Sequence, residues 1–140
     1  MSLSAIQSRL TQGCAATGRD PGSVSLIAVS KVQPLERVVA VLEAGHHLFG
    51  ENYVQEALAK WPDLRARFGA VQVHMIGPLQ TNKAKQAVEL FDAIHTLDRP
   101  SLADKLAKLA QTRGQCPDLF VQVNTGAEPQ KAGILPDDTD

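Results

Sequence analysis

The chain of 140 residues lacks several features that mark particular protein classes. Its two cysteines, Cys14 and Cys116, are too few and too far apart for a disulfide framework or a Cys-x-x-Cys site. No apolar run reaches the roughly 18 residues that a transmembrane helix needs. The N-terminal residues lack a basic stretch followed by a long apolar core, so we expect no secretory signal. These absences predict a reducing, cytoplasmic location without membrane contact.

An excess of charge of either sign is also missing. The sequence has 14 basic and 15 acidic residues, which give a formal net charge of -1 at pH 7. A protein that binds the phosphate backbone of nucleic acid needs clustered Lys and Arg. The charge balance therefore argues against a nucleic-acid partner.

Three kinds of functional motif are absent. His46 and His47 are adjacent, so in a strand they would face opposite sides, and no Cys or carboxylate stands at ligand spacing from them. The segment after the first predicted strand reads Val32-Gln33-Pro34 in place of a Gly-x-Gly-x-x-Gly loop. A Gly-x-Ser-x-Gly elbow is missing as well. We therefore expect no metal site, no dinucleotide-binding loop and no hydrolase elbow.

What the sequence does contain is a regular alternation of apolar patterns. Apolar residues recur every three or four positions over 3–17, which predicts an amphipathic helix. Four further helices are predicted, starting near Pro34, at Asn52 as the capping residue, at Thr81 or Asn82, and at residue 100. Between them, short apolar runs predict strands over 23–31, 46–50, 71–76, 91–97 and 119–124.

Strands that alternate with helices indicate a parallel sheet with right-handed crossovers. The strand centres recur about every 23 residues, a length that suits βα units. Two α/β architectures fit this pattern. One is a doubly wound open sheet, complete at this length. The other is the first part of a closed eight-stranded barrel, which needs on the order of 200 residues. Composition does not choose between them.

In both architectures ligands bind at the carboxyl ends of the strands. Lys31 ends the first predicted strand, directly after an apolar run. Lysine is rarely buried, and partial burial here would favour the neutral, nucleophilic amine that Schiff-base chemistry requires. The alternative is a lysine whose ammonium group simply lies in solvent. His74 lies in the third predicted strand, opposite Val73 and Met75, as either a hydrogen-bonded core histidine or a ligand contact.

Three blocks of sequence carry a family resemblance. They are Ala28-Val29-Ser30-Lys31, Phe49-Gly50-Glu51-Asn52-Tyr53-Val54-Gln55-Glu56, and the run from His74 through Gly77-Pro78-Leu79-Gln80 to Lys83. Val123-Asn124-Thr125 with Glu128, Lys131 and Gly133 continues the match. Together these blocks resemble the pyridoxal phosphate (PLP) homeostasis family, also called the proline synthetase co-transcribed family.

The resemblance implies a fold. It is an α/β, (β/α)8 TIM-type barrel of the alanine-racemase kind, known as PLP fold type III. Residues 1–140 would supply about the first five strands of one PLP-binding domain that is truncated at its C-terminal end. In the family the phosphate is held by later strands, so we name no phosphate-binding residue.

The resemblance also implies a site. The lysine matching Lys31 forms a Schiff base with PLP, and the asparagine matching Asn52 lies at the cofactor. The third-strand block, here His74, Ile76 and Gly77, helps to line the pocket. The lysine matching Lys131 lies near the site. Val32 departs from the pattern, because the family commonly has Thr after the lysine.

The function that the resemblance implies is PLP binding without catalytic turnover, in intracellular PLP homeostasis or carriage. Recipient PLP-dependent apo-enzymes are the expected partners, and no catalytic residue is named. Two alternatives stay open: a PLP-dependent, racemase-like enzyme, and an inactive fragment of a barrel. For the racemase alternative, the one tyrosine, Tyr53, sits in a helix-opening motif and is a doubtful base.

Overall fold

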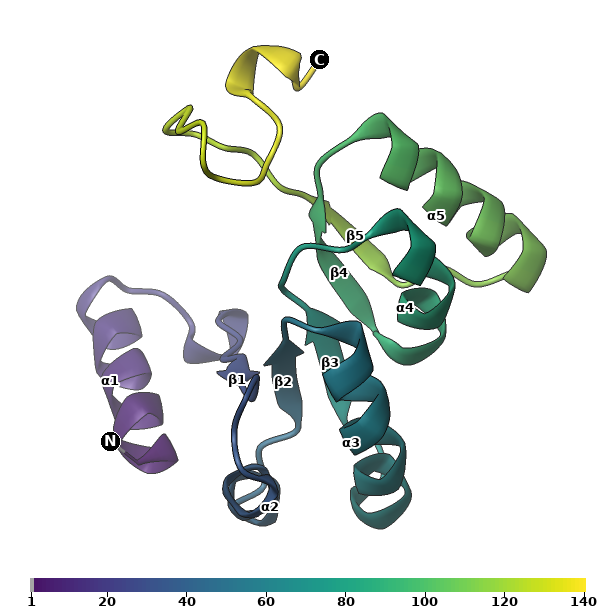
Figure 1. The fold of residues 1–140 in the computed structure, drawn as a ribbon. Helices are drawn as coiled ribbons and strands as arrows, with labels where there is room; N and C mark the ends of the chain where they lie inside the picture. The colour runs from purple at the N-terminus through teal and green to yellow at the C-terminus, as the bar shows by residue number, and fades with distance from the viewer. Residues whose placement is uncertain (1) are drawn as a thin grey trace.

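The computed structural model describes residues 2–140 and contains one sheet of five parallel strands (Figure 1). The strands are β1 (Ala28–Val29), β2 (Leu48–Glu51), β3 (Gln72–Met75), β4 (Ala93–Leu97) and β5 (Asp118–Val121). The helices are α1 (Leu3–Ala16), α2 (Leu35–Glu43), α3 (Val54–Phe68), α4 (Ala84–Leu90) and α5 (Pro100–Arg113). Three 3-10 turns complete the order, η1 (Pro21–Ser23), η2 (Thr81–Lys83) and η3 (Pro136–Asp138).

The strand order decides between the two predicted architectures. Each strand pairs in parallel with the next one along the chain, in the order β1-β2-β3-β4-β5. A doubly wound sheet reverses its strand order at a switch point, whereas a barrel adds its strands in sequence. The doubly wound alternative is therefore wrong. The chain forms an arc of a barrel, as the resemblance implied.

The predicted helices agree with the structure to within a few residues. The helix predicted from Thr81 or Asn82 starts as the 3-10 turn η2, and α4 itself begins at Ala84. Two further details differ. Asn52 does not cap α3, which begins at Val54 with Tyr53 as its N-cap residue and has no side-chain cap. Asn52 instead forms a bend between β2 and α3, and its backbone lies against Gly77. The first strand is only two residues long, Ala28–Val29, whereas the apolar run predicted 23–31.

One face of the sheet forms the core. Side chains of α2, α3, α4 and α5 pack on this outer face, and α1 lies apart from them beyond β1 (Figure 1). Phe49 of β2 and Trp61 of α3 lie at the centre, with ring centroids 4.9 Å apart. Both side chains are almost fully buried. None of the helices described in residues 2–140 is long and apolar enough to cross a membrane.

The opposite, inner face is open. Val29 is 50% exposed, and all four residues of β5 are exposed. Along β3 the buried Val73 and Met75 alternate with the partly exposed His74, as the period of a strand requires. The inner face therefore presents side chains that the described helices do not cover.

Arg65 of α3 ties the helix layer to the amino-terminal edge of the sheet. Its guanidinium donates to the carbonyl oxygens of Val71 at 3.1 Å and Leu90 at 2.6 Å, and to Asp92 Oδ2 at 2.8 Å. The same Asp92 oxygen accepts the Val73 amide at 2.8 Å. Truncation of Arg65 would thus leave several polar groups with fewer partners.

We expect Arg65→Met to lower the free energy of unfolding by about 1–3 kcal/mol, because hydrogen bonds at partly buried carbonyls are lost. The matched control is Arg67→Met, two residues along α3, where the ion pair with Glu43 is 60% exposed on both sides. That control should change stability by less than about 0.5 kcal/mol. Urea denaturation measures both, and equal losses would contradict the assignment.

Candidate functional site

Lys31 lies in a turn directly after β1, at the carboxyl edge of the sheet, and its side chain is exposed. The partial burial considered from the sequence is therefore not provided by the described residues. The reason is that β1 ends at Val29, two residues before the lysine, so the side chain is beyond the paired part of the strand. The amine is accessible to a ligand at this edge.

The residues on both sides of Lys31 are held firmly. The Ser30 amide donates to the Gly50 carbonyl at 3.0 Å, and the Ser30 hydroxyl donates to Glu51 Oε1 at 2.8 Å. On the other side, the Val32 amide donates to Glu56 Oε1 at 2.6 Å. Val32 has a φ of 54°, a left-handed conformation that a β-branched residue rarely adopts. Such strain persists where surrounding contacts fix the backbone.

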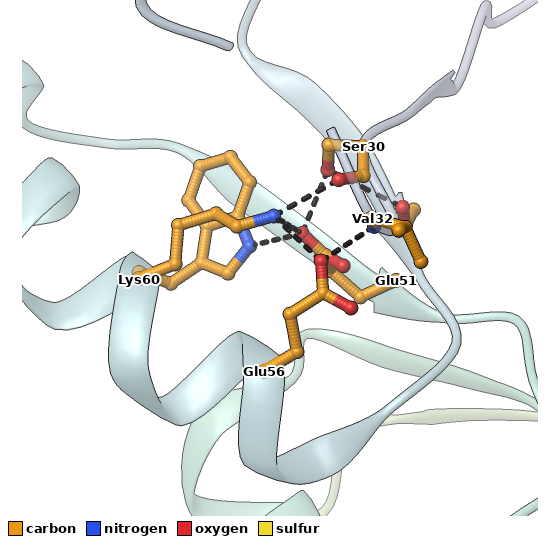
Figure 2. A network of polar contacts seen from close by, with 7 residues as sticks. Ser30, Val32, Glu51, Glu56 and Lys60 are labelled. Carbon is orange, nitrogen blue, oxygen red and sulfur yellow. Dashed lines mark hydrogen bonds and ion pairs between the residues drawn. The ribbon is translucent and has the colours of Figure 1, made fainter. Parts of the chain in front are cut away.

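Most of these contacts belong to one buried polar network, drawn in Figure 2. Its centre is Glu51, whose side chain is 0% exposed. Glu51 Oε1 accepts from Lys60 Nζ at 2.8 Å and from Trp61 Nε1 at 2.9 Å, in addition to Ser30. Lys60 Nζ also donates to the Ser30 carbonyl at 2.9 Å and pairs with Glu56 Oε1 at 3.3 Å.

Sequence reasoning missed the role of this network. Glu51 was visible only as a polar residue at a strand end. The one local signal was the spacing of Glu56 and Lys60, four residues apart, which places them on one helix face. That spacing alone does not distinguish a buried network from an exposed ion pair.

Asn52 and Gly77 meet at the carboxyl ends of β2 and β3. The Ile76 amide donates to the Glu51 carbonyl at 2.9 Å, which extends the pairing of the two strands to this point. A Cβ on Gly77 would lie 2.4 Å from the Asn52 carbonyl oxygen, so only glycine allows this approach. Asn52 Oδ1 is buried and has no hydrogen-bond partner among the described residues. The asparagine oxygen is thus an unsatisfied acceptor inside this edge of the sheet, as is Glu51 Oε2.

Ile76 lies on the inner face of the sheet, above Gly50 of β2. An added Cβ on Gly50 would lie 2.8 Å from Ile76 Cδ1 and 2.9 Å from Ile27 Cγ2. The two isoleucines therefore occupy the space above Gly50. Lys31, Asn52, Ile76 and Gly77 accordingly come from three neighbouring strands and gather at one edge of the sheet.

His74 is hydrogen-bonded, as one of the two sequence interpretations proposed, but it lies on the open inner face and not in the core. Its Nδ1 is 3.0 Å from Nε2 of His95 on β4, and His95 stacks on Phe120 with centroids 4.6 Å apart. Burial lowers the pKa of both histidines from the usual 6.5. For His74 the neighbouring His95 lowers the pKa further, while Asp92 and Asp118 oppose the shift.

Lys131 lies in the segment that follows β5, beyond the carboxyl end of that strand (Figure 1). Its ammonium pairs with Glu128 at 3.6 Å, and both side chains are at least half exposed. The segment is anchored by Asn124, which hydrogen-bonds the Glu128 backbone, and by the Gly133 amide, which donates to Asp98. The structure therefore places Lys131 after β5 and pairs it with Glu128, not with the β1–β3 residues.

These residues fit an aldehyde-bearing aromatic cofactor such as PLP. Lys31 supplies an accessible primary amine after β1, and Asn52 supplies a buried, unpartnered oxygen after the neighbouring strand β2. Ile76 and His74 line the open inner face next to that edge. Among residues 2–140, no group of three or more His, Cys, Asp or Glu is arranged to hold a metal ion.

We predict that Gly77→Ala lowers the free energy of unfolding by about 1–3 kcal/mol, because the new methyl group must displace the Asn52 backbone. Gly13→Ala is the matched control: it lies within α1 with no heavy atom within 4 Å of the added Cβ. There alanine should stabilise by about 0.5–1 kcal/mol, since it favours helix. Thermal unfolding of both variants tests the opposite signs; a neutral Gly77→Ala would refute the close approach.

The histidine pair should make stability depend on pH. Because the folded pKa values lie below 6.5, the unfolded chain binds protons more readily as the pH falls through that value. Stability should thus be complete above about pH 7.5 and decline toward pH 5. His95→Gln should flatten the decline in the urea midpoint, whereas the exposed control His47→Gln should keep it. Identical pH profiles for wild type and His95→Gln would contradict this assignment.

Comparisons with known proteins agree with the sheet topology described above. The chain is 36% identical to the pyridoxal phosphate homeostasis protein of Haemophilus influenzae over 136 residues, which are 97% of this chain and 57% of that protein. It superposes on PipY from Synechococcus elongatus PCC7942, solved without PLP, with a TM-score of 0.78 at 41% identity, covering 92% of this chain and 60% of that one. For PipY with PLP bound, the TM-score is 0.76 at 38% identity, with 92% and 59% coverage.

The chain therefore spans a little over half the length of the relatives that it matches. The family model for the alanine racemase N-terminal domain matches residues 1–140, the whole of this sequence. The parallel strand order of a barrel and the identities of 36–41% to these relatives agree with this family match. The chain belongs to the alanine racemase N-terminal domain family.

Proposed function

We propose that this chain binds PLP through a Schiff base to Lys31 and acts in cytoplasmic PLP homeostasis. It would hold the cofactor without catalysing a reaction. The observation that carries the proposal is that an exposed lysine and an unpartnered Asn52 oxygen follow the neighbouring strands β1 and β2 at the carboxyl edge of the sheet. The names of the relatives and the PLP bound in PipY support the choice of cofactor.

The chemistry that Lys31 would perform is simple and reversible. The lone pair of its unprotonated amine adds to the cofactor aldehyde, and water leaves as the carbon–nitrogen double bond forms. No oxidant or reductant is consumed. Asn52 Oδ1 would accept a hydrogen bond from the cofactor, while Ile76 and His74 would provide one wall of the site. Gly77 would keep the ends of β2 and β3 close enough to hold Asn52 in place.

A carrier needs this bond but not an acid–base pair that removes a substrate proton. Glu51 Oε1, Glu56 Oε1 and the Lys60 ammonium are already engaged with one another and with the Lys31 turn. Tyr53 is 57% exposed at the start of α3 and is not held as a base would need to be. These features favour binding without turnover, with transfer of PLP to recipient apo-enzymes as its purpose.

Racemase-like activity on amino acids is the second candidate, favoured by the family model of the alanine racemase N-terminal domain. A shared fold does not by itself establish a shared reaction. Incubation with PLP and a panel of single-enantiomer amino acids, followed by chiral chromatography, separates the two candidates. We expect no inversion with any member of the panel, and sustained inversion would establish the enzyme.

The Lys31 assignment is tested by borohydride, which reduces a Schiff base to a stable amine. With PLP present, mass spectrometric peptide mapping should place a pyridoxyl group on Lys31 of the wild type. Lys31→Ala should lose this adduct, because the variant lacks the attacking amine, whereas the exposed control Lys85→Ala should keep it. An adduct on other lysines only, or undiminished PLP binding by Lys31→Ala, would exclude the proposed site.

A further inference from the structure

Two lysines lie at the site, and their surroundings differ sharply. Lys31 is exposed in the turn after β1, whereas the side chain of Lys60 is only 10% exposed. An ammonium group has three N–H donors. Lys60 directs its donors to three acceptors, the Ser30 carbonyl and the carboxylates of Glu51 and Glu56. Lys60 is therefore committed to a structural role, while Lys31 is accessible to a ligand.

The polar network around Lys60 fixes Ser30 and Val32, the two residues that flank Lys31. Ser30 is fixed through its hydroxyl by Glu51 and through its carbonyl by Lys60. Val32 is fixed by Glu56 in a left-handed conformation, which a valine would leave if the contact were lost. The backbone on each side of Lys31 is thus set by side chains of β2 and α3.

We infer that Glu56 and Lys60, with the buried Glu51 carboxylate, are positioning residues that orient Lys31 toward an aldehyde cofactor and keep Lys60 out of the reaction. This inference rests on the proposed function. Without the network, the 30–32 turn relaxes toward the backbone conformations that Val32 prefers, and the Lys31 amine samples a wider volume. A displacement of about 1 Å from productive geometry is enough to slow a bond-forming step substantially.

Glu56 is the best residue for a test. Its side chain is 27% exposed, and Lys60 stays paired with Glu51 when Glu56 is removed. Glu56→Ala removes the acceptor for the Val32 amide, whereas Glu56→Gln keeps an oxygen that is able to accept it. Asp63→Ala is the matched control, an exposed acidic residue seven positions further along the same helix. Melting temperatures of all variants separate a folding defect from a positioning defect.

The first measurement is the rate at which borohydride and PLP label Lys31, read by peptide mapping. We expect Glu56→Ala to label Lys31 about tenfold more slowly than wild type, with Glu56→Gln within about threefold and Asp63→Ala unchanged. Equal rates for Glu56→Ala and wild type would overturn the inference. Equally slow Ala and Gln variants would overturn it too, because the hydrogen bond would not be the cause. If Glu56→Ala does not fold, Glu56→Leu takes its place, because it also lacks the acceptor but fills more of the vacated space, and the same slowing is expected.

The second measurement needs no cofactor. Hydrogen exchange of the Val32 amide should accelerate in Glu56→Ala and remain near the wild-type rate in Glu56→Gln, and unchanged exchange in both variants would overturn the inference. The two failures are distinguishable. A wild type that is never labelled at Lys31 rejects the proposed function, and the positioning role toward the cofactor with it. A wild type that is labelled, with Glu56→Ala labelled equally fast, rejects the positioning role alone.

Discussion

A carboxylate with no exposed surface joins three parts of this fold. Glu51 stands at the end of β2 and accepts hydrogen bonds from Ser30 after β1 and from Lys60 and Trp61 on α3. A buried charge is costly unless it is paired and hydrogen-bonded, so these three elements are constrained to meet at this point. Their meeting point lies directly under the turn that carries Lys31. The local geometry of the candidate site therefore depends on a buried carboxylate, whose other oxygen, Oε2, has no partner among the described residues.

A second contact constrains the carboxyl edge of the sheet, where the ends of β2 and β3 meet. Gly77 approaches the Asn52 backbone more closely than any side chain would allow, and the Thr96 hydroxyl donates to the Gly77 carbonyl at 2.8 Å. The ends of β2, β3 and β4 are thus drawn together. Asn52 keeps a buried oxygen without a partner among the described residues, and the exposed Lys31 follows the neighbouring strand.

The periodicity of apolar residues was enough to predict most elements. The stripe of Leu102, Leu106 and Leu109 predicted a helix from residue 100 to 113, and the structure has α5 over Pro100–Arg113. Periodicity did not predict the strand order, because a doubly wound sheet and a barrel have the same βα repeat. The order was reached through the family motifs and is confirmed by consecutive pairing along the chain. The Asn52 cap was wrong, because the contact with Gly77 comes from a distant strand.

Among the site residues, the motifs identified Lys31, Asn52, Ile76 and Gly77, which the structure brings to one edge. The network beneath them was not predicted, because the burial of Glu51 and Lys60 depends on how β2 packs against α3. His74 was left between two interpretations for the same reason, since its partner His95 comes from the next strand. Local sequence shows which residues carry chemistry, but the partners that orient them come from elsewhere in the fold.

The central claim is that Lys31 is the residue that bonds to the cofactor. Absorbance spectroscopy of the protein with added PLP, repeated on Lys31→Ala, tests this claim most directly. In the wild type, the band of the free aldehyde should be replaced by the band of a protonated imine, and the Lys31→Ala spectrum should remain that of free PLP. The same imine band in both proteins would contradict the claim.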